Sequence, residues 1–217
     1  MSNTTDVARA TDPKARLQLG LQELGMHLGR AAQAKLLTFA DLLQKWNRTY
    51  NLTGIREAGS IVSGHLLDSL SIAPYVEAKS MLDVGSGAGF PGIPLAISAP
   101  NMRVTLLDSN QKKAAFLRQA VSDLDLSNAS VVCERVESWQ PQEKFDVIVS
   151  RAVTGLGEFI RLSRHLLAPD GRFAAMKGAL SQQELADLPQ GFRVRETRRI
   201  QVPGLDAERN LVLMERA

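Results

Sequence analysis

A glycine-rich segment constrains this chain more than any other feature of its sequence. The segment D-V-G-S-G-A-G-F-P-G (83–92) follows a short apolar run and precedes an amphipathic stretch, with Pro91 suited to the first turn of a helix. Glycines between a strand and a helix let backbone N–H groups approach a ligand and aim a helix N-terminus at it. The segment therefore predicts binding of a nucleotide-like ligand; the alternative is a purely structural tight turn.

Strand-like and helix-like segments alternate from Ser80 onward. This alternation is typical of parallel βαβ units, whose sheet is covered by helices on both faces. The last two apolar runs lack a clear helix between them, which favours an antiparallel C-terminal hairpin closing a mostly parallel, seven-stranded α/β sheet. The expected strands are 81–84, 104–107, 130–133, 146–149, 172–176, 192–202 and 210–215, and the expected helices are 93–98, 110–124, 156–167 and 181–187.

Residues 1–78 are predicted to form a helical extension packed on a domain at 79–217. Apolar residues recur there at steps of three and four, as on one face of a helix. Trp46 and Tyr50 continue that apolar stripe, so both are expected in the core. The expected helices are 13–28, closed by Gly29, then 31–50 and 61–70, with a break at 51–54 and an end at Pro74.

Composition limits the compartment and the kinds of site. The 217 residues include one cysteine, Cys133, which cannot form an internal disulfide, so a cytoplasmic location is expected. Three histidines and one cysteine leave little material for a structural zinc site, and no metal is expected. No apolar run is long enough to cross a bilayer and residues 1–12 lack a signal-peptide core, so no membrane association is expected.

The formal net charge of +3 resides in one segment. Residues 193–199 contain four arginines and one glutamate, so the rest of the chain sums to zero. A basic stretch beside a neutral body indicates a nucleic-acid partner, and Arg195 and Arg199 are candidate substrate contacts. An edge strand protected by solvated arginines explains the pattern equally well.

The spacing of the glycines bears on which ligand binds. The pattern G-x-G-x-x-G at 87–92 formally matches a dinucleotide site, with Asp108 about 20 residues beyond it. Counted from Gly85, however, the spacing is G-x-G-x-G, and Phe90 stands where the third dinucleotide glycine would fall. Two acids suit a cofactor with a cationic amino-acid end and a ribose: Asp83 can face the cation and Asp108 can accept from ribose hydroxyls. A nicotinamide-binding oxidoreductase remains the alternative.

The glycine segment and L-L-D (106–108) resemble the first two motifs of the Rossmann-like S-adenosyl-L-methionine-dependent methyltransferases. A narrower resemblance, to the RsmG or GidB family, covers about residues 36–215. The motifs that carry it are W-N-R-T-Y-N-L-T (46–53), H-L-L-D-S (65–69), G-F-P-G-I-P (89–94), L-L-D-S-N-x-K-K (106–113), F-L-R-Q (116–119), R-V-E (135–137), S-R-A (150–152) and V-P-G-L-D-x-E-R (202–209).

The family methylates guanine N7 in the 530 loop of 16S ribosomal RNA, at guanine 527. The resemblance therefore implies a Rossmann-like methyltransferase fold, S-adenosyl-L-methionine as cofactor, and 16S rRNA or the small ribosomal subunit as partner. A methyltransferase acting on a small molecule is a second alternative, and a monomer is expected. The cofactor contacts that the resemblance and the two acids imply are Asp83, Gly85, Ser86, Gly87, Phe90, Asp108, Val136, Glu137 and Arg151.

The residues after the fourth expected strand, Ser150-Arg151-Ala152, occupy the usual catalytic position of this fold class. They lack the Asn/Asp-Pro-Pro-aromatic sequence that serves amine methylation. Cys133, which cytosine C5 methylation would require as a nucleophile, is interpreted as a small residue of a buried strand. Guanine N7 has a free lone pair, so one in-line displacement with Arg151 as an orienting group is expected. The alternative for Arg151 is a structural salt bridge.

Three residues of the helical extension are candidate substrate contacts. His65 and Asp68 are three positions apart and share a helical face, where they could shape the rim of the site or contact RNA. A local hydrogen bond that stabilises the helix explains them equally well. Asn51, in the break between two expected helices, is the third candidate.

Overall fold

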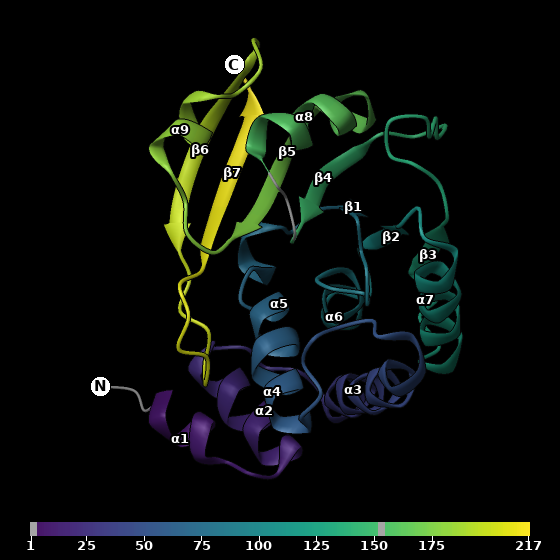
Figure 1. The fold of residues 1–217 in the computed structure, drawn as a ribbon, viewed down its shortest axis with the longest axis vertical. Coiled ribbons are helices and arrows are strands. Elements are labelled where there is room, and N and C mark those ends of the chain that lie inside the picture. The colour runs from purple at the N-terminus through teal and green to yellow at the C-terminus, as the bar shows by residue number, and fades with distance from the viewer. Residues whose placement is uncertain (1–3, 152–154) are drawn as a thin grey trace.

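One seven-stranded sheet organises the protein (Figure 1). The computed structural model describes residues 4–151 and 155–217. The strand order is β3-β2-β1-β4-β5-β7-β6; the first five strands are parallel, and β7 runs antiparallel to both of its neighbours. This confirms the mostly parallel sheet with an antiparallel C-terminal hairpin. The strands are β1 Ser80–Val84, β2 Arg103–Leu107, β3 Ala129–Val132, β4 Phe145–Ser150, β5 Leu167–Lys177, β6 Phe192–Arg199 and β7 Asn210–Arg216.

Helices cover both faces of this sheet and form a separate layer below it in the view of Figure 1. None of the helices in the described parts of the chain is long and apolar enough to span a membrane. The α-helices are α1 Thr4–Arg9, α2 Pro13–Glu23, α3 Arg30–Tyr50, α4 Ala58–Ile61, α5 Asp68–Leu70, α6 Gly92–Ser98, α7 Gln111–Asp123, α8 Leu156–Ser163 and α9 Gln182–Ala186, with a π-helical turn at Val62–Leu67 and 3₁₀ turns at Ala73–Tyr75 and Arg164–Leu166.

The first helices begin and end through local capping. The Asp12 carboxylate accepts from the N–H groups of Lys14 and Ala15 and starts α2. That helix ends before Gly25, whose φ of 65° is left-handed, so the prediction that it continues to Leu28 and is closed by Gly29 is wrong. Gly29 instead precedes α3 as its N-cap.

Helix α3 matches the apolar stripe of the sequence and ends at Asn51, whose left-handed φ of 48° reverses the chain. Phe39 and Leu43 are fully buried, and Trp46 is half-buried against Phe116 at 5.5 Å between ring centroids. Tyr50, expected in the core, is 46% exposed; it lies in the last turn of α3, where its ring packs against Trp46 at 5.1 Å between centroids.

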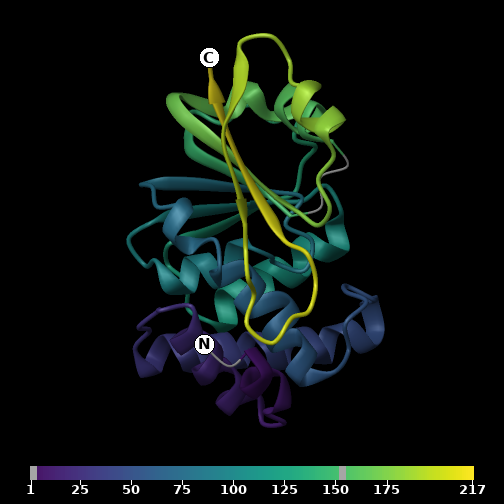
Figure 2. The ribbon, with the colours of Figure 1, turned by 90° about the vertical axis from the view of Figure 1, so that its left-hand side faces the viewer.

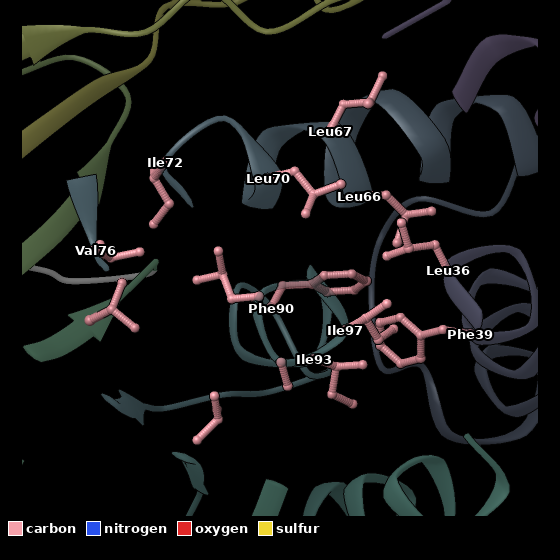
Figure 3. Packing of buried hydrophobic residues seen from close by; sticks show 14 of the residues in the cluster. Leu36, Phe39, Leu66, Leu67, Leu70, Ile72, Val76, Phe90, Ile93 and Ile97 are labelled. Atoms are coloured by element: carbon pink, nitrogen blue, oxygen red, sulfur yellow. The ribbon is translucent and has the colours of Figure 1, made fainter. Parts of the chain in front are cut away.

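The N-terminal helices share one apolar cluster with a face of the sheet (Figure 3). Phe39 of α3 lies 5.2 Å from Phe90 of the glycine segment, and Leu66 and Leu70 pack over the same region. A second cluster fills the other face beneath α8. The ligand-binding segment is therefore held between the helical layer and the sheet.

The connection between β6 and β7 reaches the helical layer, where Figure 2 shows it passing beside the first helices. Gly204 lies so close that a Cβ there would be 2.7 Å from Ser63 Oγ and 2.8 Å from a Val7 methyl group. Val202 is buried in the shared cluster. This docking brings the β6–β7 connection beside the helical segment that contains His65 and Asp68.

Several local expectations differ from the structure. Cys133 is half-buried and follows the end of β3, because β3 is an edge strand with one neighbour rather than a buried strand. Pro91 is the N-cap of α6 rather than a residue of its first turn. Helix α8 ends at Ser163, and the residues up to Leu166 form a 3₁₀ turn before β5.

Candidate cofactor and acceptor site

The site lies at the topological switch point of the sheet, where the strand order reverses. The chain passes from β1 to β2 on one side, whereas β4 pairs with the other edge of β1 and leads to β5. Ligands of open α/β sheets bind at the carboxyl ends of the strands at such a switch point. The glycine segment follows β1 there, and Arg151 follows β4.

The glycine segment is a tight turn bound to the neighbouring strand. The N–H groups of Gly85 and Ser86 both donate to the Leu107 carbonyl, at 2.8 and 3.0 Å. Gly85 has a φ of 70°, which favours glycine, and a Cβ placed on it would meet no atom within 4 Å. At Gly89 the same addition would lie 2.6 Å from an Ile93 methyl group. The segment thus packs tightly at Gly89 and opens at Gly85.

Asp83 lies beneath this turn and is completely buried. Its Oδ2 accepts from the Gly92 N–H at 2.9 Å, whereas its Oδ1 is buried without a hydrogen-bond partner in the described structure. Burial raises the pKa of this carboxyl to about 7, although the Gly92 and Ser86 hydrogen bonds oppose the shift. Asp83 therefore supports the turn from below and offers one unpartnered oxygen.

Asp108 anchors the same turn to the end of β2. Its Oδ2 accepts from the Gly87 N–H at 2.9 Å and its Oδ1 from the Asn110 N–H at 2.8 Å. Lys113 Nζ lies 3.8 Å from Oδ2. The residue is 7% exposed, and its carboxylate holds the glycine turn and the start of the following loop.

These features fit the cofactor that the sequence implies. The orphaned Asp83 oxygen, the open face of Gly85 and the acid at the end of β2 are what a cofactor with a cationic end and a ribose requires. Val136 and Glu137 form a turn after β3, with Val136 half-buried and Glu137 exposed. No group of three or more potential metal ligands occurs among residues 4–151 and 155–217.

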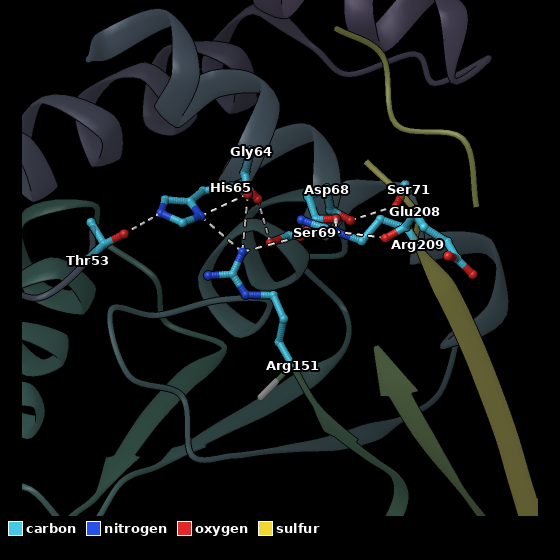
Figure 4. Close-up of polar contacts among 9 residues, drawn as sticks. All are labelled: Thr53, Gly64, His65, Asp68, Ser69, Ser71, Arg151, Glu208 and Arg209. Atoms are coloured by element: carbon cyan, nitrogen blue, oxygen red, sulfur yellow. Dashed lines mark hydrogen bonds and ion pairs between the residues drawn. The ribbon is translucent and has the colours of Figure 1, made fainter. Parts of the chain in front are cut away.

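Arg151 connects the glycine segment to the helical layer (Figure 4). Its guanidinium lies over the Phe90 ring, 4.9 Å from the centroid, and its Nη1 is 3.3 Å from Asp68 Oδ2. Nη1 also donates to His65 Nδ1 at 3.0 Å. Burial lowers the pKa of Arg151, and Asp68 opposes that shift. The structure confirms the ion pair that sequence analysis held as the alternative, and it places that pair inside the site. Ala152 lies outside the described residues.

His65 is held as a neutral ring between Thr53 and Arg151. Because arginine carries only donors, Nδ1 accepts from Arg151, and the Nε2–H donates to Thr53 Oγ1 at 2.7 Å. The Gly64 carbonyl, 2.9 Å from Nδ1, accepts from the same Arg151 nitrogen. Burial, followed by the charges of Arg151 and Arg209, lowers the pKa of His65 to about 4. The ring also stacks on Phe90, at 4.5 Å between centroids.

Asp68 joins a second arginine that sequence analysis missed. Its Oδ1 accepts from Arg209 Nε at 2.9 Å, and its side chain is only 1% exposed. Arg209 is the last residue of the V-P-G-L-D-x-E-R motif, which could have marked it as a candidate. Thr53 likewise ends the motif at 46–53. His65 belongs to the π-helical turn, a feature frequent at functional sites, and Asp68 follows it as the first residue of α5, so that Arg151 Nη1 reaches both.

A cavity of about 330 Å³ opens beside this network. It lies at the carboxyl ends of β4 and β5, next to the glycine segment through Arg151 and Phe90. Its cations come from three separate elements of the chain, and its acid is paired to two of them. The lining residues are Ile55, Gly64, His65, Asp68, Arg151, Met176, Lys177, Gly178 and Arg209.

The remaining candidate substrate contacts lie outside this cavity. Asn51 is exposed at the end of α3, where it accepts from Arg56 Nη2 at 3.1 Å. Arg195 and Arg199 lie on β6, which is an edge strand. This agrees with the alternative that the basic segment is an edge strand protected by solvated arginines. Arg195 is 3.6 Å from Glu215, whereas Arg199 pairs in register with Asn210 beside Arg209. Of the two, Arg199 is thus nearer the site.

Comparison with known proteins gives relatives over almost the whole chain. Residues 32–212 match the family model GidB, described as rRNA small subunit methyltransferase G. Proteins named ribosomal RNA small subunit methyltransferase G from Laribacter hongkongensis and Aromatoleum aromaticum are 55% and 54% identical to this chain. The alignments cover 92% and 93% of this chain and 96% and 98% of those proteins, respectively.

Solved structures with the same fold are more distant in sequence. TrmN from Thermus thermophilus is 22% identical with a TM-score of 0.52, over 70% of this chain and 48% of its own. A precorrin-6y C5,15-methyltransferase from Geobacter metallireducens is 15% identical with a TM-score of 0.53, over 78% of this chain and 93% of its own. These likenesses confirm the Rossmann-like methyltransferase fold.

Proposed function

The chain belongs to the rRNA small subunit methyltransferase G family, and we propose that it transfers a methyl group from S-adenosyl-L-methionine to N7 of guanine 527 in the 530 loop of 16S rRNA. The family membership makes it an S-adenosyl-L-methionine-dependent rRNA methyltransferase. The acceptor atom and its position are those that the family resemblance implies, and the chemistry of the site supports an acceptor that attacks with its own lone pair.

The observation that supports this acceptor is that the described residues lining the cavity include no free base. His65 is neutral with a pKa of about 4, its Nδ1 accepts from Arg151, and Asp68 is held by two arginines. The cavity therefore offers hydrogen-bond donors and positive charge. An acceptor that must lose a proton before attack would find no base there, whereas guanine N7 attacks with its own lone pair.

The cofactor, when bound, supplies an electrophilic sulfonium methyl group. We assign its binding to the turn formed by Gly85, Ser86 and Gly87, with Asp83 below it and Asp108 at the end of β2. Phe90, Val136 and Glu137 border the same edge of the sheet. The open face of Gly85 and the unpartnered oxygen of Asp83 support this assignment.

Arg151 orients the guanine in this proposal. Among the described residues its hydrogen bonds all run from Nη1, so that Nε and Nη2 remain for an acceptor such as guanine O6. Asp68, held also by Arg209, fixes the guanidinium from behind, and the Phe90 ring supports it from below. Catalysis then consists of positioning and electrostatics for one in-line displacement.

The direct test uses 30S particles and naked 16S RNA from a strain lacking the methylation. Incubation with tritiated cofactor is followed by mapping of 7-methylguanine. We expect label at guanine 527 in one of the two substrates. Label at another atom or position contradicts the acceptor assignment, and no label in either contradicts the rRNA substrate and favours a small-molecule acceptor.

A thermal-shift measurement tests the cofactor separately. We expect S-adenosylhomocysteine to raise the melting temperature, since a ligand that binds only the folded state stabilises it. Stabilisation by NADH instead would favour the oxidoreductase that the glycine pattern at 87–92 allows. As part of the same proposal, the enzyme acts as a monomer in the cytoplasm on 16S rRNA or the small subunit, without a membrane.

A further inference from the structure

A second, smaller cavity lies on the other side of the loop at 51–57. It has a volume of about 210 Å³ and is lined by Gln44, Asn47, Arg48 and Arg56, which come from the last turns of α3 and from the loop. None of these residues belongs to the network around Arg151. The cavity therefore needs an explanation of its own.

The electrostatics of this region are strongly one-sided. Residues 44–56 contain three cations, Lys45, Arg48 and Arg56, and no carboxylate. Arg48 is exposed and forms no ion pair with any residue of the described chain. Among the described residues, the Arg56 guanidinium donates to the neutral side chain of Asn51. Two guanidinium groups thus line one small cavity, and neither forms an ion pair with a described residue; the carboxylate of Glu57, next in the chain, accepts instead from the N–H groups of Gly59 and Ser60.

The cavity is lined by two kinds of hydrogen-bond donor: the side-chain amides of Gln44 and Asn47, and the guanidinium groups of Arg48 and Arg56. Gln44 Nε2 donates to the Arg56 carbonyl at 3.1 Å, and Asn47 Nδ2 donates to the Thr53 carbonyl at 2.9 Å. These amides hold the loop, which leaves the guanidinium groups as the donors for a ligand. Planar guanidinium groups match the oxygens of a phosphate group, and the absence of acid selects for an anion.

The position of the cavity indicates which phosphate group would bind there. Ile55 lines the acceptor cavity and Arg56 lines the smaller one, and consecutive Cα atoms are about 3.8 Å apart. We propose that the smaller cavity binds a backbone phosphate of the RNA strand next to the methylated guanine, an inference that rests on the proposed function. Asn47 holds the loop segment whose Thr53 also bonds to His65, so the two sites share one support.

The test compares the wild-type enzyme with Arg48→Gln, Arg56→Gln and the double variant, on whichever of 30S particles or naked 16S RNA the wild type methylates. We expect KM for the RNA substrate to rise with kcat retained, because a phosphate contact contributes equally to ground-state and transition-state binding. The slope of log(kcat/KM) against log salt should shrink by about 0.7 for each arginine removed. Arg164→Gln, which replaces an exposed cation in the 3₁₀ turn before the amino end of β5, is the matched control and should change neither quantity.

The outcomes separate this inference from the proposed function. Each variant must first show the wild-type melting temperature and the wild-type response to S-adenosylhomocysteine, which establishes an intact fold and cofactor site. If the wild type methylates its RNA and the double variant has an unchanged KM and salt slope, the phosphate site is refuted while the function stands. If millimolar inorganic phosphate stabilises the wild type but not the double variant, and KM is unchanged, the cavity binds a free anion and the RNA assignment is wrong. If the wild type methylates neither RNA, both proposals fall.

Discussion

Arg151 Nη1 lies 3.3 Å from Asp68 Oδ2, although the two residues are 83 positions apart in the chain. The contact joins the end of β4 to the helical layer and closes one side of the acceptor cavity. The Asp68 side chain is 1% exposed and also receives Arg209, so one carboxylate holds two cations from different segments. The following predictions test what this arrangement does.

Asp68→Asn should destabilise the protein and abolish methyl transfer. Removing the charge leaves two guanidinium groups without their counter-ion; a broken buried pair costs about 3–5 kcal/mol, and we expect about 2 kcal/mol here because both arginines reach solvent. Urea unfolding measures the change. Glu143→Gln, which breaks the exposed pair with Arg103 at 2.8 Å, should cost less than about 1 kcal/mol. Equal losses in the two variants would contradict a special role for Asp68.

Arg151→Ala should retain the fold and lower the rate of methyl transfer by about a hundredfold or more, as expected when a preorganised donor is lost. Arg151→Lys should not restore it, because an ammonium group lacks the planar fork that reaches Asp68, His65 and an acceptor together. Transfer from tritiated cofactor gives the rate, and circular dichroism gives the fold. Turnover near the wild-type rate in Arg151→Ala would refute the orienting role.

Gly85→Ala should prevent cofactor binding at a small cost in stability. The position has a φ of 70° and faces open space, so a methyl group adds about 1–2 kcal/mol of backbone strain and projects into the proposed cofactor site. The rise in melting temperature caused by S-adenosylhomocysteine should disappear. Gly25→Ala is the matched control: its φ of 65° and open surroundings carry the same strain, and the cofactor response should persist.

His65 should make the protein less stable as the pH falls from 6.5 towards 4. Its pKa is lowered from 6.5 to about 4 in the folded state, so the unfolded chain binds more protons in that interval and is favoured there. The loss amounts to roughly 3 kcal/mol by pH 4. His65→Gln removes the titrating group, so its free energy of unfolding should fall less over the same range. Parallel curves for the two proteins would show that His65 is not neutral in the native site.

Much of the fold follows from local pattern. Three features were predictable: the alternation of strands and helices, its end at the antiparallel hairpin, and the apolar face of α3. Each reflects a period of two or 3.6 residues along the chain. The exposure of Tyr50 and the partial exposure of Cys133 were not predictable in this way. Each depends on which neighbour covers an element's end or edge, and that neighbour is distant in sequence.

The site, too, has a part that local sequence predicts and a part that depends on tertiary contacts. The sequence by itself determined the glycine turn, its two acids and the resemblance that implies the cofactor, because these are written in consecutive residues. Only the tertiary structure decided that Thr53, His65, Asp68, Arg151 and Arg209 form one network, and that Asp83 is buried with one unpartnered oxygen. Their contacts arise from docking of the helical layer and of the β6–β7 connection on the sheet. A contact of this kind depends on distances through space, which a pattern of neighbours along the chain does not contain.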